Sequence, residues 1–289
     1  MKKDIKDAIK FITPLSIFLI LFILLPVVGT IINSLYKDVT FIEKKFVLFE
    51  NYKTLFKDKG FFQSLKFTIL FIVASVPAEI VLGILIALVL NEVTPLSGFL
   101  RVAVLIPWAI PSVISARIWQ LIYNYNFGLL NFILLKSGLT CTPINFLGTK
   151  LSSFVSIVIA DIWKTTPFVS LIILAGLQTI PESIYDQAKV DGAGIFKRFF
   201  YITLPLLKGA ITVALLFRTI DAVRIFDLIY ILTGGGPGGS TTSLSLYGYK
   251  FFLAGDFGYG STVSCILFVI SLIFSIFYVK SIGFKKEFL

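Results

Sequence analysis

The sequence predicts an all-α, polytopic membrane protein with six transmembrane helices. Hydrophobic residues make up 57% of the 289 residues and charged residues 15%, whereas a soluble domain usually holds about a quarter charged residues. The mean hydropathy is +0.93. The apolar content excludes a disordered chain, and the shortage of polar residues argues against a soluble enzyme.

Six stretches are long and apolar enough to cross a bilayer. A spanning helix needs about 20 residues, because each residue rises ~1.5 Å and the hydrocarbon layer is ~30 Å thick. The first stretch follows basic residues as in a signal peptide, but it is too long and lacks a small-residue cleavage pattern, so we predict an uncleaved helix. The predicted spans cover residues 11–32, 68–90, 100–122, 154–177, 204–227 and 262–280.

Several predicted spans contain proline. Proline kinks a helix and is tolerated where neighbouring helices satisfy the freed carbonyls. One interpretation is ordinary kinking of membrane helices, and the other is that Pro107, Pro111 and Pro167 shape a central cavity. The prolines are Pro14, Pro26, Pro77, Pro107, Pro111 and Pro167.

The orientation of the chain rests on a narrow difference in basic residues. With both termini inside, the inner and outer segments hold almost equal numbers of Lys and Arg. The short loop at 91–99 and the two basic termini favour cytoplasmic tails at 1–10 and 281–289. Residues 33–67 then form an external loop.

Ionisable residues inside the spans are candidate functional groups, because a charge in the bilayer is unfavourable unless it faces protein or water. Four of them follow one another at intervals of three residues, a spacing at which side chains meet on a helix. They form either a structural ladder of ion pairs, with some groups reaching water at the helix ends, or the wall of a wet translocation path. The residues are Glu79, Arg117, Asp161, Lys164, Arg218, Asp221, Arg224 and Asp227.

The alternating signs of these charges argue against a path for a simple ion. A neutral polar solute such as a sugar fits better. Trp163, Thr165, Thr166 and Phe168 suit that solute, because aromatic faces and hydroxyls together bind sugar rings, although tryptophan is also common at membrane interfaces. The candidate residues of a substrate path are Trp163, Thr166, Phe168, Arg218, Asp221, Arg224 and Asp227.

The segment at 178–203 interrupts the membrane pattern. Pro181 is suited to begin a short helix whose acidic residues Glu182 and Asp186 complement the helix dipole, and Gly192 and Gly194 are suited to end it. A second amphipathic helix follows. This pair is too polar to span the membrane, and we expect it to lie at the membrane surface and present side chains to a partner.

This segment resembles the EAA signature of permease subunits of binding-protein-dependent ABC importers. The signature has Glu-Ala-Ala, three residues, Gly, and later Ile-x-Leu-Pro. The chain reads Asp186-Gln187-Ala188, then Gly192, then Ile202-Thr203-Leu204-Pro205. Asp186 and Gln187 depart from the signature, while the spacing to Gly192 is kept.

The resemblance extends to the sugar permeases of the maltose/trehalose type. Residues 177–181 are similar to the lead into the loop of those permeases, and residues 217–237 to their fifth span and the loop after it. Residues 49–52 and 162–168 also resemble that branch. The four stretches occur in the same order across six predicted spans.

The resemblance implies a type I ABC importer permease fold, with a permease core at 68–280 and a coupling loop at 178–203. That loop would dock on a separate ATPase subunit. Other implied partners are a second similar permease, a second ATPase subunit and an extracytoplasmic sugar-binding protein, and the location is the inner membrane. The coupling residues would be Glu182, Asp186, Gln187, Ala188, Asp191, Gly192, Ala193 and Gly194.

No enzyme chemistry is predicted for the chain. Gly234 to Gly239 is glycine-rich, but no Gly-Lys-Ser/Thr follows, so it is not a phosphate-binding P-loop. The sequence has no His and two distant cysteines, and no nucleophile–base constellation is evident. We therefore expect no catalytic, metal or cofactor site, with ATP and Mg bound by partner subunits, and no nucleic-acid partner.

Two other function classes are consistent with six spans. An ion-coupled secondary transporter would show an inverted repeat or coupling carboxylates, and it leaves the polar loop at 178–203 unexplained. A membrane assembly factor leaves the charges within the spans without a role in a cavity. Within the importer hypothesis, a disaccharide or short oligosaccharide is the expected substrate, with polyols and glycerol phosphates as alternatives.

Overall fold

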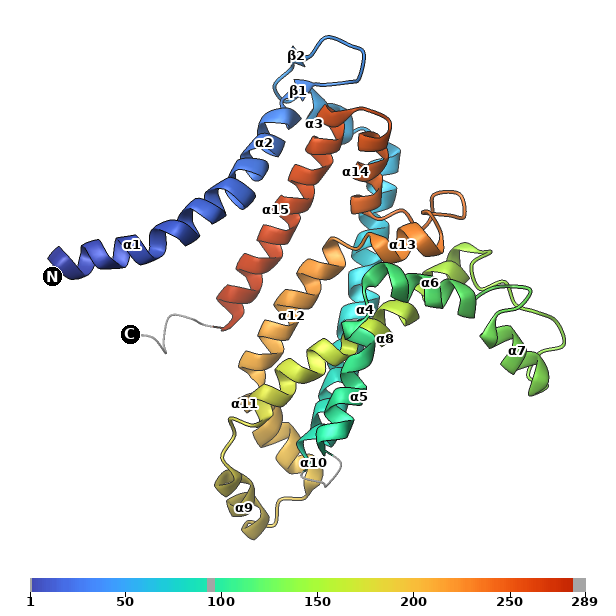
Figure 1. The fold of residues 1–289 in the computed structure, drawn as a ribbon. Helices are drawn as coiled ribbons and strands as arrows, with labels where there is room; N and C mark the ends of the chain where they lie inside the picture. The colour runs from blue at the N-terminus through green and yellow to red at the C-terminus, as the bar shows by residue number, and fades with distance from the viewer. Residues whose placement is uncertain (1, 93–96, 283–289) are drawn as a thin grey trace. The chain divides into compact units, whose positions relative to one another are not determined.

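The structure is a computed structural model that describes residues 2–92 and 97–282 (Figure 1). The chain forms two compact units, one of residues 1–62 and 247–269, the other of residues 63–246 and 270–289. The predicted C-terminal tail lies almost wholly outside the described residues, as does the middle of the predicted inner loop at 91–99.

The described part of the chain is helical, which confirms the predicted fold class. Four helices are long and apolar enough to cross a membrane as single rods: Lys10–Ser34, Lys59–Asn91, Lys150–Leu177 and Phe257–Ser281. Two bent pairs, Gly98–Ala109 with Ser112–Ile122 and Ile195–Leu206 with Lys208–Val223, bring the number to six if each pair is one span. The third and fifth predicted spans are thus broken, whereas the first, second, fourth and sixth are continuous helices.

The elements that make up the first rod are α1 (Lys2–Leu19), η1 (Ile20–Leu24) and α2 (Leu25–Ser34). The π-helical turn η1 lies immediately before Pro26, where a proline removes a helical hydrogen bond. The other rods are α4 (Lys59–Asn91), α8 (Lys150–Leu177) and α15 (Phe257–Ile282). Pro77 and Pro167 lie inside α4 and α8 without breaking them.

The third span breaks between α5 (Ser97–Ala109) and α6 (Ser112–Ile122), which meet at a bend of 89°. Pro111 causes the break, because it has no N–H to continue the helix and disfavours the α conformation at Ile110. Pro111 adopts an extended backbone with ψ 140°, and its carbonyl accepts the N–H of Ser115 to start α6.

The fifth span is broken at Leu207, where the chain bends by 64° after Pro205. It ends at Val223, so the sequence from Arg224 to Phe226 leaves the helix before α13 begins. The elements of this region are α9 (Glu182–Val190), α10 (Ile195–Arg198), η2 (Phe199–Thr203), α11 (Leu204–Leu206), α12 (Lys208–Val223) and α13 (Asp227–Leu232).

The first unit contains a small cap of irregular structure. Strands β1 (Tyr36–Lys37) and β2 (Lys45–Phe46) form an antiparallel pair followed by α3 (Glu50–Leu55). The hairpin is tied to the start of α15, because the N–H of Phe257 donates to the carbonyl of Asp38 at 2.8 Å.

Asp58 joins three segments of the first unit. Its carboxylate accepts hydrogen bonds from the Tyr247 hydroxyl, the Tyr259 hydroxyl at 3.2 Å and the Gly60 N–H at 2.7 Å. Partial burial acts to raise the pKa of Asp58, but these hydrogen bonds outweigh it and lower the pKa below its ordinary value. The start of α4 is thereby held to α14 (Leu244–Leu253) and α15.

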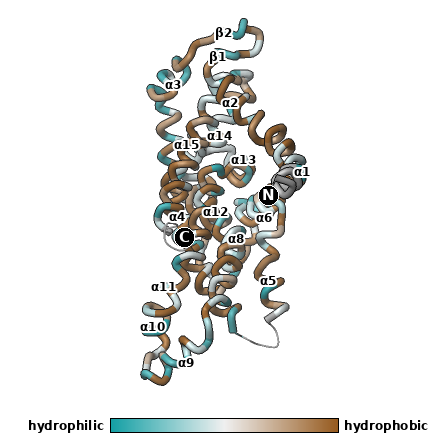
Figure 2. Tube along the Cα trace, turned by 90° about the vertical axis from the view of Figure 1, so that its left-hand side faces the viewer, coloured by the Kyte–Doolittle hydropathy of each residue, from teal (hydrophilic) through white to brown (hydrophobic). Residues whose placement is uncertain are grey.

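In the second unit α8 is the central helix. It packs against α5 and α12, while α6 packs against α13. Gly83 of α4 approaches α8 so closely that a Cβ there would lie 2.5 Å from Val169 Cγ1, the kind of small-residue contact that brings membrane helices together. Figure 2 shows α8 and α12 as largely hydrophobic, with hydrophilic colour gathered in α9.

Candidate functional site

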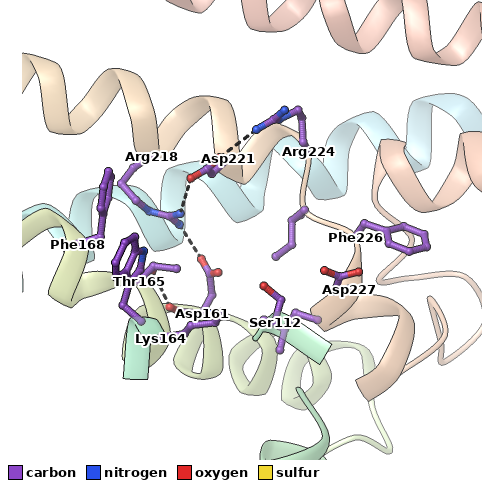
Figure 3. Close-up of a pocket in the computed structure, with 13 residues that line it drawn as sticks. Ser112, Asp161, Lys164, Thr165, Phe168, Arg218, Asp221, Arg224, Phe226 and Asp227 are labelled. Carbon is purple, nitrogen blue, oxygen red and sulfur yellow. Dashed lines mark hydrogen bonds and ion pairs between the residues drawn. The ribbon is translucent and has the colours of Figure 1, made fainter. Parts of the chain in front are cut away.

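The second unit holds a cavity of about 500 Å³ between α5, α6, α8, α12 and α13 (Figure 3). This volume lies within the ~300–1,000 Å³ usual for small-molecule sites. Polar and aromatic residues form one side of the cavity lining, and the residues at the end of α12 form the other side. The lining residues are Trp108, Ser112, Asp161, Lys164, Thr165, Phe168, Arg218, Asp221, Arg224, Ile225, Phe226, Asp227 and Leu228.

Arg218, at the cavity wall, joins three spans. Its Nε donates to Glu79 Oε2 at 2.5 Å, and its Nη2 donates to Glu79 Oε1 and Asp161 Oδ2, both at 3.0 Å. Glu79 is fully buried and the Arg218 side chain is 4% exposed. Thr165 donates a further bond to Glu79 at 2.9 Å. One guanidinium thus compensates two buried carboxylates, from α4 and α8.

The ion pairs become more exposed toward the end of α12. Asp221 lies 3.8 Å from the buried Arg218 and 3.1 Å from Arg224, which is itself exposed. Asp227 follows the helix end and reaches the cavity from the first turn of α13. The predicted ladder therefore continues from Arg218 to Arg224, and the break at Val223 directs Asp227 to another wall.

The charges that line the cavity balance. Asp161, Asp221 and Asp227 carry three negative charges, and Lys164, Arg218 and Arg224 carry three positive charges. Such a set offers both hydrogen-bond donors and acceptors, and the buried Glu79, which shares Arg218 with Asp161, adds a fourth carboxylate behind it. The chemistry of this lining suits a neutral solute with many hydroxyl groups.

An aromatic wall forms the side of the cavity near α5. Trp108 stacks on Phe168 with ring centroids 5.6 Å apart and an interplanar angle of 17°. Phe168 meets the edge of Phe217 at 6.1 Å. These rings provide a rigid apolar face beside the charged groups, as ligand sites with a few oriented polar contacts do.

Lys164 links the aromatic wall to the break in the third span. Its ammonium donates to the carbonyl of Ile110 at 2.7 Å. This carbonyl follows the end of α5, where helix carbonyls lack intrahelical partners and the helix dipole favours a positive charge.

The cavity brings together most of the predicted path residues. Phe168, Arg218, Asp221, Arg224 and Asp227 line it. Two predicted path residues lie elsewhere. Trp163 packs edge-on against Trp119 at 5.7 Å, and Thr166 is buried with its hydroxyl bonded to the Ile162 carbonyl. Both point to other faces of α8.

The residue selection from sequence did not include Trp108, Ser112 or Phe226, whereas Thr165, which was named among the sugar-binding side chains, lines the cavity. Asp161 and Lys164 were named among the charges that form either an ion-pair ladder or the wall of a path, but they were not in the selected set of path residues. Helical spacing was the available signal, since Asp161, Lys164, Thr165 and Phe168 recur at intervals of three and four on one face of α8. Trp108 and Ser112 lie on either side of the break at Ile110 and Pro111, and both line the cavity.

The predicted coupling loop forms two short helices joined by a tight turn. The Ala193 N–H donates to the Ala188 carbonyl at 2.8 Å and the Gly192 N–H to the Lys189 carbonyl at 3.0 Å. This pattern is a Schellman motif, which needs a left-handed residue after the helix. Gly192 supplies it with φ 75°. The spacing from Ala188 to Gly192 therefore has a structural cause.

One face of α9 is exposed. Ser183, Asp186, Gln187, Val190 and Asp191 border a shallow hollow along it, at the spacing of one helix face. Val190 is 88% exposed. On the other side, the Tyr185 hydroxyl lies 3.0 Å from that of Thr203 and holds α9 to η2.

Comparisons with known proteins agree with this geometry. The family described as "Binding-protein-dependent transport system inner membrane component" matches residues 79–282. The trehalose/maltose transport system permease protein MalF of Thermococcus litoralis is 51% identical over 286 residues, which cover 99% of this chain and 96% of that protein. The sulfoquinovosyl glycerol transport system permease protein SmoG of Agrobacterium fabrum is 38% identical, covering 96% and 91%.

A solved structure shares the fold. A chain from the crystal structure of a bacterial ABC transporter involved in the import of the acidic polysaccharide alginate matches with a TM-score of 0.84 and 25% identity, over 99% of both chains. The related structure determined with an alginate pentasaccharide-bound periplasmic protein matches with a TM-score of 0.82. These proteins are transport components rather than enzymes. The chain belongs to the family of binding-protein-dependent transport system inner membrane components.

Proposed function

We propose that this permease subunit carries a neutral sugar, a disaccharide or short oligosaccharide, through the cavity between α5, α8, α12 and α13. An extracytoplasmic binding protein delivers the sugar, and the subunit alternates between outward-open and inward-open states. The relatives named for trehalose and maltose or for sulfoquinovosyl glycerol support a sugar-like substrate.

The observation that carries this proposal is the combination of a cavity lined by charges of both signs and a stacked aromatic wall. Trp108 and Phe168 offer a flat apolar face to the hydrophobic side of a sugar ring. Asp221 and Asp227 offer acceptors to its hydroxyls, and Arg224 offers donors. A cavity that served a simple ion would be expected to carry an excess of one sign.

The energy for transport comes from partner subunits in this proposal. The coupling loop, with the exposed face of α9 at its centre, docks on one of two ATPase subunits, and a second similar permease completes the pathway. The exposed side chains of that face and the rigid turn at Gly192 support a contact that transmits force. ATP and Mg are bound by the ATPases.

The proposed topology places both termini and the coupling loop in the cytoplasm. The first span at 11–32 and the external loop at 33–67 precede a permease core at 68–280. The loop at 233–237 then lies outside, near the face visited by the binding protein. The basic termini and the basic residues of the coupling loop support this orientation.

Uptake of radiolabelled sugars by cells expressing the complete transporter tests the proposed substrate. We expect saturable uptake of a disaccharide whose KM rises in W108A and D221N, because these changes remove the stacking face and a hydroxyl acceptor. A KM that is unchanged from wild type in both variants would contradict the site. Transport of glycerol phosphate or a polyol in place of a sugar would contradict the substrate class.

A further inference from the structure

The bend between α5 and α6 determines which side chains of the third span face the cavity. Trp108 lies in the last turn of α5 and Ser112 in the first turn of α6, on either side of Ile110 and Pro111. In a continuous helix, residues four apart would lie one above the other. With a bend of 89°, their positions depend on how the break is held.

The backbone at the break between α5 and α6 contributes little to holding its geometry. Pro111 has no N–H, so it cannot close a helical bond onto the last turn of α5. The carbonyls at the end of α5 need partners from elsewhere. The Ile110 carbonyl finds one in a different span, the Lys164 ammonium at 2.7 Å.

Lys164 and Phe168 contact the end of α5 at two adjacent points. They lie four residues apart on α8 and so occupy neighbouring positions on one helix face. Lys164 bonds Ile110, and Phe168 stacks on Trp108, two residues earlier in α5. The carboxylate of Asp161, one turn before Lys164, accepts a hydrogen bond from Arg218 at 3.0 Å. The ammonium is thus directed to a backbone carbonyl, and the ion pair of Asp161 is made with another side chain.

We infer that Lys164 is a positioning residue for substrate recognition: by holding the Ile110 carbonyl it fixes the break in the third span and sets Trp108 and Ser112 against the cavity. The inference rests on the proposed function, because it assigns Lys164 a role in the same cavity. Lys164 acts through Trp108, and the sugar is contacted by the aromatic face that Lys164 holds in place.

A double-mutant cycle on transport kinetics tests this role. The variants are K164M, K164R, W108A and K164M/W108A, with K150M as control because Lys150 is the first residue of the same helix. Sugar uptake by the complete transporter is measured for KM and Vmax, with the amount of permease in the membrane determined by immunoblot.

We expect K164M to raise KM about tenfold, because this change corresponds to part of the free energy of one charge-assisted hydrogen bond. Vmax per permease should stay within about twofold of wild type. K164R keeps the charge and the donors and should restore KM. The double variant should be no worse than W108A, because Lys164 has nothing left to position. K150M should match wild type.

Other outcomes overturn the inference. Multiplied KM effects in K164M/W108A would mean that Lys164 acts independently of Trp108, as a direct sugar contact would. A normal KM in K164M would remove Lys164 from recognition. If K164M does not reach the membrane, K164Q replaces it in the cycle, and loss of both while K164R transports normally would assign Lys164 to folding alone.

Failure of the proposed function gives a different result. If the cavity does not bind the sugar, W108A and D221N leave KM unchanged whatever Lys164 does. A raised KM in W108A together with a normal KM in K164M would retain the cavity and reject only the positioning role.

Discussion

At the scale of single residues, Arg218 has the least freedom to change. It is almost fully buried and compensates Glu79 and Asp161, which lie on two other spans. Removing one member of a buried ion group leaves the others uncompensated, at a cost of ~3–5 kcal/mol. Arg224, one turn later, is a useful contrast, because its pair with Asp221 is exposed to solvent, where ion pairs are worth ~0–1 kcal/mol.

We expect R218M to lower the thermal unfolding midpoint of the detergent-purified permease far more than the matched variant R224M. The triple variant E79Q/D161N/R218M should regain much of the lost stability, because it leaves no buried charge without a partner. Thermal unfolding followed by intrinsic fluorescence measures all three. Equal midpoints for R218M and R224M would contradict the view that the buried group holds the spans together.

The sequence predicted the charged residues of the site well and their separate roles poorly. The spacing from Arg218 to Asp227 indicated one stripe, but it could not show that Arg218 turns inward to Glu79, because that contact joins residues 139 positions apart. Nor could it show that the helix ends at Val223 and separates Asp227 from the stripe. Trp163 was selected and Trp108 was not named, because hydropathy and residue type do not reveal which face of a helix meets a cavity.

At the scale of elements, the spans were predictable where the helix is straight. The predicted end of the fourth span, residue 177, is the end of α8. The predicted start of the second span at residue 68 falls inside α4, which begins at Lys59, because hydropathy reports the lipid-facing length and a helix can extend beyond the hydrocarbon. The break at Ile110 lies directly before Pro111, which signalled a kink but not its angle, and the break at Leu207 follows Pro205.

The helix pair α9 and α10 carries a prediction about coupling. D186K reverses a charge on the exposed face of α9, and G192V places a branched side chain where φ is 75°, a conformation that is strained for β-branched residues. We expect each variant to insert normally and to reduce sugar transport about tenfold or more while ATP hydrolysis persists, because the contact that transmits closure is altered.

The assay for this prediction compares ATPase activity and sugar uptake in proteoliposomes of the assembled transporter. G209A is the control, since Gly209 is an exposed glycine in α12 with open space around its Cα and no positive φ. Unchanged uptake in both D186K and G192V would remove α9 from the coupling path.

At the scale of the whole molecule, the chain has a cavity between its helices but no P-loop in its sequence. In our account the cavity and the coupling loop belong to one subunit of a larger machine, and neither performs transport by itself. The family match at 79–282 covers both features. The sequence pointed to this organisation through the polar segment that interrupts six apolar stretches, because a segment unable to span or pack alone needs a partner.

The most direct test of this account is affinity purification of the tagged full chain in mild detergent, with measurement of the ATP hydrolysis that co-purifies. We predict an ATPase subunit and a second hydrophobic protein of similar size, with hydrolysis stimulated by a sugar-loaded binding protein. Repeated recovery of the chain alone, together with sugar uptake that depends on a proton or sodium gradient, would contradict it.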